Sequence, residues 1–178
     1  MVSLVVIFWM YVIMFGIIGA MRGWAKELLV TFSVILALFF ITVLEIFVPF
    51  IRDVLSFGNG APLFWIRLAI TAILVLFGYQ TPNIPKIAGG NRFARERLQD
   101  VLLGIFIGMV NGYFVMGSIW YFLNAAAYPF PNIVSAPTGD VLTLVNKYMA
   151  VLPPALLATP AIYFAVAIAF ALVLMVFI

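Results

Sequence analysis

Long apolar stretches separated by short polar segments make up most of the chain. A helix needs about 20 apolar residues to cross the roughly 30 Å hydrocarbon layer of a bilayer. Five stretches come close to that length or exceed it, at 3–21, 28–50, 62–80, 101–125 and 160–178. The first has no basic segment before it and no clean cleavage site, so we interpret it as a retained span rather than a signal peptide. The pattern predicts an all-α integral membrane protein with a bundle of about five transmembrane helices.

A different pattern lies between the fourth and fifth stretches, in the segment 126–159, which contains five prolines. Within it, apolar residues recur at helical spacing over 138–152, and polar residues fall on the opposite face. This spacing predicts one amphipathic helix that lies along the membrane surface or on the bundle. We therefore divide the chain into a four-span core at 1–125, this proline-rich outer segment, and a fifth transmembrane helix at 160–178.

The composition agrees with this prediction and excludes several classes of function. Hydrophobic residues make up 67% of the 178 residues and charged residues only 8%, whereas about a quarter of the residues in soluble proteins are charged. A water-soluble enzyme is therefore excluded. The chain contains no cysteine and no histidine, which removes thiol catalysis, thiolate metal sites and the commonest metal ligand. We predict no enzyme activity, no cofactor and no metal, and a net charge of +3 gives no indication of a nucleic-acid partner.

The basic residues predict how the bundle is oriented. Those expected on one side of the membrane are Arg22, Lys26, Lys86, Arg92, Arg95 and Arg97, and those expected on the other side are Arg52 and Lys147. Cytoplasmic segments carry the excess of lysine and arginine in membrane proteins. The sequence therefore predicts a multi-pass protein of the bacterial cytoplasmic (inner) membrane, with its N-terminus outside and its C-terminus in the cytoplasm.

The basic segment before the fourth span is also a candidate interaction site. Arg92, Arg95 and Gln99 are spaced to share one face of a helix just below the membrane, and Arg97 flanks them. We expect this face to contact anionic lipid head groups. Docking of an acidic partner is the alternative.

Three polar residues inside the predicted spans need a partner or a function, because such residues are costly in lipid. Glu45, near the end of the second span, and Arg67, near the start of the third, lie at similar depth and are predicted to form an ion pair. The alternatives are that each side chain extends separately to the membrane interface, or that the two form a proton or ion site. Asn111, near the middle of the fourth span, is predicted to form a hydrogen bond between helices.

Small residues recur every four positions on two of the predicted helices. They are Gly104, Gly108 and Gly112 on the fourth span, and Ala161, Ala165 and Ala169 on the fifth. Such faces allow helix backbones to approach closely, within the chain or with another membrane subunit. At the cytoplasmic ends of the spans, Glu27 and Asp100 are expected to neutralise neighbouring cations such as Arg22, Lys26 and Arg97.

Two short motifs resemble those of the colicin V production protein family. The turn after the first span, with Arg22, Gly23, Trp24 and Glu27, resembles the family's Arg-Gly-aromatic-x-x-Glu turn. The entry to the fourth span is similar to the family's Asp-Arg-x-x-Gly…Gly…Arg-Gly pattern, and its matching positions are Asp100, Gly104, Gly108, Asn111 and Gly112. The order of spans also agrees, over roughly residues 1–125. Val101 and Asn111 stand where the family has arginines, so any role of those cations is absent or moved.

The resemblance implies a fold and a compartment rather than a mechanism. The family consists of small inner-membrane proteins that are needed for colicin V export or production, hence for toxin biosynthesis, and that are linked to envelope homeostasis. Our leading hypothesis is a non-catalytic membrane scaffold or accessory subunit of a larger assembly. The alternative is a small transporter or channel component, in which Glu45, Arg67 and Asn111 line a path. A membrane enzyme has the least support, because no carboxylates are closely paired in the sequence.

Overall fold

The computed structural model describes residues 4–48, 50–51, 60–80 and 94–177, and the regular elements assigned within them are all α-helices. The helices are α1 (Leu4–Arg22), α2 (Trp24–Phe47), α4 (Ala61–Tyr79), α6 (Ala94–Ala125), α7 (Gly139–Val151), α8 (Pro153–Leu156) and α9 (Ala161–Phe177). The predicted all-α fold is confirmed.

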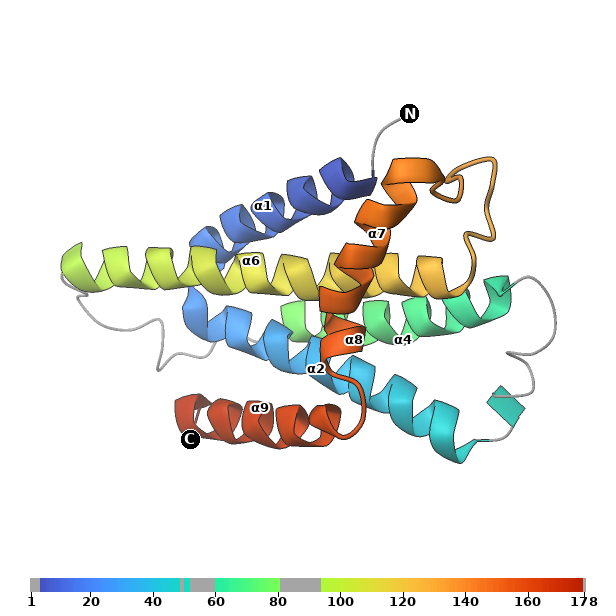
Figure 1. The fold of residues 1–178 in the computed structure, drawn as a ribbon. Helices are drawn as coiled ribbons and strands as arrows, with labels where there is room; N and C mark the ends of the chain where they lie inside the picture. Colours follow the sequence, from blue (N-terminus) through green and yellow to red (C-terminus); the bar gives the residue numbers. More distant parts are fainter. Residues whose placement is uncertain (1–3, 49, 52–59, 81–93, 178) are drawn as a thin grey trace.

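The long helices lie side by side, and α7 crosses them obliquely (Figure 1). Helix α1 packs along α6, while α2 contacts α4, α6 and α9 and so lies at the centre of the bundle. The ends of α1 and α4 and the starts of α2 and α6 lie toward one side of the picture in Figure 1. The cations Arg22, Lys26 and Arg97, which the sequence assigns to one side of the membrane, therefore belong to the same end of the bundle.

Four of the described helices are long and apolar enough to cross a membrane: α1, α2, α4 and the part of α6 from Arg97 to Ala125. This architecture is compatible with a multi-pass membrane protein. Helix α9 is equally apolar but has only 17 residues, fewer than the about 20 that a span needs. The fifth predicted span, at 160–178, corresponds to α9, whose 17 described residues make it one of the shorter apolar helices. In Figure 1, α9 begins beside the middle of α2 rather than at its far end.

The connection between the first two helices is shorter than the predicted turn. Helix α1 ends at Arg22 and α2 begins at Trp24, so Gly23 alone separates them, and α2 starts four residues before the predicted position. Gly23 has a φ of 83°, a conformation that glycine adopts without the steric cost of a Cβ atom. Helix α6 likewise starts before the predicted span and is 32 residues long.

Helix α7 confirms the predicted amphipathic helix and lies on the bundle. Apolar side chains from its second half are buried against Phe8 of α1 and Trp120 of α6. They are Val145, Met149 and Leu152, which directly follows the helix. The apolar residues of its first half are not buried: Val141, Leu142 and Leu144 remain exposed. The short helix α8 follows directly and approaches α6 so closely that a Cβ atom on Gly117 would lie 2.8 Å from Cδ of Pro153.

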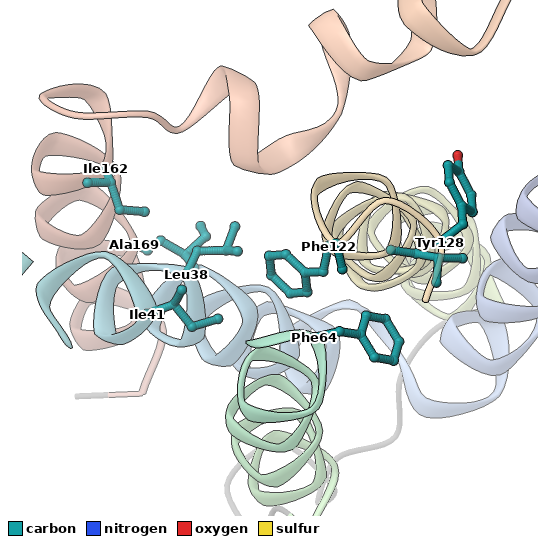
Figure 2. Close-up of a cluster of buried hydrophobic side chains, with 10 residues drawn as sticks. Leu38, Ile41, Phe64, Phe122, Tyr128, Ile162 and Ala169 are labelled. Atoms are coloured by element: carbon teal, nitrogen blue, oxygen red, sulfur yellow. The ribbon is translucent and has the colours of Figure 1, made fainter. Parts of the chain in front are cut away.

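The largest apolar cluster joins α2, α4, α6 and α9. In Figure 2, Phe122 points from α6 toward Leu38 on α2, while Ile162 and Ala169 approach α2 from α9. Burying these side chains against one another holds α9 to the bundle by dispersion contacts, which are the main attraction between helices when lipid surrounds them.

Candidate functional site

The crossing of α1 and α6 is a contact between backbones. Gly104 and Gly108 face Gly19, and a Cβ atom built on Gly108 would lie 3.0 Å from Cα of Gly19. A Cβ atom on Gly112 would lie 2.9 Å from Cα of Val12. The small-residue face of α6 is therefore occupied by α1 of the same chain. Of the two uses that the spacing allows, packing within the chain and contact with another subunit, this face serves the first.

The two motifs that resemble those of the colicin V production family meet where α1 passes into α2. The backbone N–H of Trp24 donates to Oδ1 of Asp100 at 3.3 Å. A Cβ atom on Gly23 would lie 2.9 Å from the same oxygen, so glycine leaves room for this carboxylate. Asp100 thus lies at the N-terminus of α2, where a negative charge interacts favourably with the unpaired N–H groups and the helix dipole.

Arg22 links three helices at this end of the bundle. Its Nη1 atom lies 2.7 Å from Oε1 of Glu27 in an ion pair. Its Nη2 atom donates to the main-chain oxygen of Tyr79 at 3.1 Å, and the guanidinium lies 4.3 Å from the centre of the Tyr79 ring. This pair is the predicted neutralisation of Arg22 by Glu27, and it ties the end of α1 to α2 and α4.

Glu27 is completely buried and its carboxylate is bound on both oxygens. Asn111 donates from Nδ2 to Oε2 of Glu27 at 2.8 Å and to its main-chain oxygen at 3.0 Å. Thr31 in turn donates to Oδ1 of Asn111 at 2.7 Å. A buried charge is tolerated only when it is paired and hydrogen-bonded, and here both conditions are met. The interhelical hydrogen bond predicted for Asn111 is confirmed.

We refer to Arg22, Glu27, Thr31, Tyr79 and Asn111 as the Glu27 cluster. Sequence reasoning did not identify two of its members. Thr31 follows Glu27 by four residues and so lies on the same face of α2, a signal that the sequence does contain. Tyr79 enters through its main chain and its ring at the end of α4, and no spacing in the sequence indicates that contact.

The predicted pair of Glu45 and Arg67 forms at the opposite end of α2. Nε of Arg67 lies 2.7 Å from Oε1 of Glu45, and the two side chains are 15% and 27% exposed, respectively. The guanidinium also lies 5.5 Å from the centre of the Phe122 ring. The pair borders a pocket of about 500 Å³ that opens to the outside of the bundle. Asn111 is not among the residues that line this pocket.

The basic segment is only partly described. Arg97 is exposed on the first turns of α6. The backbone of Arg95 belongs to the same helix, but its side chain lies outside what the structure describes, and so do Lys86, Arg92 and Arg52. The expected contacts of this segment with anionic lipid or with an acidic partner stay predictions.

Comparison of the chain with protein-family models, with curated proteins and with solved structures finds no match. In the Glu27 cluster each charged or amide group bonds to another helix of the same chain, an arrangement that fixes helices relative to one another and leaves the central carboxylate without exposed surface.

Proposed function

We propose that this protein is a non-catalytic membrane scaffold or accessory subunit of a larger assembly in the bacterial inner membrane, of the type implied by its resemblance to the colicin V production family. The observation that carries the proposal is the burial of the motif residues. Glu27 and Asn111 have no exposed surface, and their polar atoms bond to neighbouring helices. The motifs therefore stabilise the bundle, and the outer surface is left for association.

The chemistry of the buried carboxylate supports a structural role. A general acid or base must come within hydrogen-bonding distance of the proton that it transfers. Both oxygens of Glu27 are already engaged, one by Arg22 and one by Asn111. A substrate would have to displace these partners and separate α1 or α6 from α2.

In this proposal the end of the bundle that carries Arg22, Lys26 and Arg97 faces the cytoplasm, in accord with the excess of cations in cytoplasmic segments. The exposed Arg97 end of α6 is then available to anionic lipid or to an acidic partner. The glycine face of α6 is excluded as a docking surface because α1 occupies it.

The test is purification of the tagged protein in a mild detergent, followed by mass spectrometry of what elutes with it. We expect one or more membrane proteins in stoichiometric amount, and we expect Gly104→Leu, which separates α1 from α6, to abolish their recovery. The matched control is Leu103→Ala on the exposed side of α6, which should leave recovery unchanged. Recovery of a lone monomer that moves a solute across liposomes contradicts the proposal.

The pocket beside Glu45 and Arg67 is the one observation that favours the alternative, a transporter or channel component. That hypothesis has Asn111 on the same path, whereas Asn111 is completely buried and belongs to the Glu27 cluster. Flux measurements in liposomes distinguish the two functions. Solute uptake that Arg67→Gln abolishes would establish transport.

A further inference from the structure

The pocket near the far end of α2 combines an apolar wall with a pair of opposite charges. It is bordered by Leu38 and Ile41 of α2 and by Phe122 of α6 on its apolar side, and by Thr42, Glu45 and Arg67 on its polar side. Residues 157–159, between α8 and α9, close another side. Figure 2 shows that Phe122 of α6 points toward Leu38 of α2 within the buried apolar cluster that lies behind the pocket. The pocket has about 500 Å³, within the range of sites that bind small molecules.

The pair retains bonding capacity toward the pocket. Within the described part of the chain, the two side chains bond to each other through Nε of Arg67 and Oε1 of Glu45, which leaves the Nη atoms of Arg67 and Oε2 of Glu45 for a ligand. Both side chains keep exposed surface. A ligand with one negative and one positive group can therefore satisfy both residues at once, whereas an anion alone meets the repulsion of Glu45.

The depth of the pair matches a lipid head group. Glu45 lies two residues before the end of α2, and Arg67 lies in the second turn of α4. At 1.5 Å per helical residue, both are close to the ends of apolar helices and hence near the boundary between hydrocarbon and head groups. The apolar residues Leu38 and Ile41 lie one to two turns farther toward the middle of α2.

We propose that this pocket binds a phospholipid whose head group carries a primary amine, such as phosphatidylethanolamine. The phosphate bonds to Arg67, since guanidinium is the preferred partner of phosphate oxygens. The ammonium bonds to Glu45, and an acyl chain lies on the apolar part of the pocket lining that keeps exposed surface, at Ile46 and Leu157. A quaternary choline head group lacks the N–H donors that the carboxylate needs, and a glycerol head group lacks the positive charge.

Native mass spectrometry of the intact chain, released from detergent in the presence of one added lipid at a time, tests this site. We expect phosphatidylethanolamine to be retained roughly tenfold more than phosphatidylcholine or phosphatidylglycerol, the effect of one charge-assisted hydrogen bond. Glu45→Gln should reduce its retention to that of phosphatidylcholine, and Arg67→Gln should reduce the retention of all three lipids. Equal retention of the three lipids by the unmodified chain overturns the proposal.

Two sets of variants separate the pocket from general effects. Asp140→Asn and Lys147→Gln remove one charge each from exposed positions of α7 and should leave the lipid preference unchanged. Ala158→Trp fills the pocket without altering the ion pair and should lower retention of phosphatidylethanolamine, whereas Ala150→Trp, on the exposed face of α7, should not. A preference that survives both Glu45→Gln and Ala158→Trp also overturns the proposal, and the tryptophan variants decide the matter if Glu45→Gln does not fold.

Discussion

Asn111 of α6 donates from one side-chain nitrogen to both the carboxylate and the main-chain oxygen of Glu27 on α2, at 2.8 and 3.0 Å. Because one of these acceptors belongs to the backbone, the bond fixes the height of α6 against α2 and not only the direction of a side chain. Arg22 extends the same arrangement to α1 and α4. The relative positions of four helices therefore depend on one completely buried carboxylate.

Replacement of Asn111 should destabilise the bundle in a way that depends on charge. Asn111→Leu leaves one oxygen of Glu27 without a hydrogen-bond donor and should lower the free energy of unfolding by about 1–3 kcal/mol. Asn111→Asp places a second carboxylate against Glu27 and should lower the melting temperature further, although aspartate resembles asparagine in size. Thermal unfolding in detergent, followed by circular dichroism at neutral pH, measures both effects. An aspartate variant as stable as the leucine variant would show that the two side chains do not meet.

The ion pair of Arg22 and Glu27 should show strong coupling. Removing one partner of a buried pair costs about 3–5 kcal/mol because it leaves the other charge unpaired. We expect Arg22→Met and Glu27→Met each to lower the free energy of unfolding by about that amount. The double variant should lower it by much less than the sum of the two single effects. Lys26→Met in the same turn is the control for loss of a cation. Additive effects in this double-mutant cycle would contradict the pairing.

The pair of Glu45 and Arg67 should tolerate exchange of its charges. Glu45→Arg and Arg67→Glu each place like charges together and should lower the amount of folded protein in membranes, whereas the double variant restores opposite charges at the same positions. The effect of each single change should be smaller than at Glu27, because both side chains are partly exposed and exposed pairs are weak. Fluorescence-detected size-exclusion chromatography measures the folded fraction. Failure of the double variant to recover would argue against contact.

The contact of α1 and α6 should respond to side-chain volume at Gly104. Any Cβ atom at this position meets the main-chain oxygen of Gly19, so Gly104→Ala should be destabilising and Gly104→Leu more so. Leu103→Ala, at the neighbouring exposed position, should have little effect. The three melting temperatures in one detergent provide the comparison. Wild-type stability of Gly104→Leu is the result that would refute the close crossing.

The position of α7 on the bundle can be tested by cross-linking, because these 178 residues contain no cysteine. Nε1 of Trp9 on α1 donates to the hydroxyl of Tyr148 on α7 at 3.3 Å. We expect Trp9→Cys with Tyr148→Cys to be joined in membranes by a short bifunctional maleimide. Trp9→Cys with Lys147→Cys places the second thiol on the exposed face of α7 and should cross-link poorly. Equal yields from the two pairs would mean that α7 does not dock through this face.

Residue order allowed the pairing of Glu45 with Arg67 to be predicted, because helical rise and bilayer thickness together set the depth of every residue in a span. The same reasoning placed Asn111 in mid-span, where a hydrogen bond to another helix is its expected use. It could not name Glu27 and Thr31 as the partners. Those depend on how each helix is rotated about its axis, and rotation is decided by packing.

The apolar periods of the chain by themselves determined that it forms long helices suited to lipid, because every backbone polar group in hydrocarbon must be satisfied within its own segment. They also determined the amphipathic helix at 138–152. Only the tertiary structure decided which faces meet: glycines let α1 and α6 touch, α7 buries one half of its apolar face, and α9 begins beside the middle of α2. Many helix rotations bury similar apolar area in lipid, so close backbone contact and a few buried polar bonds select one arrangement.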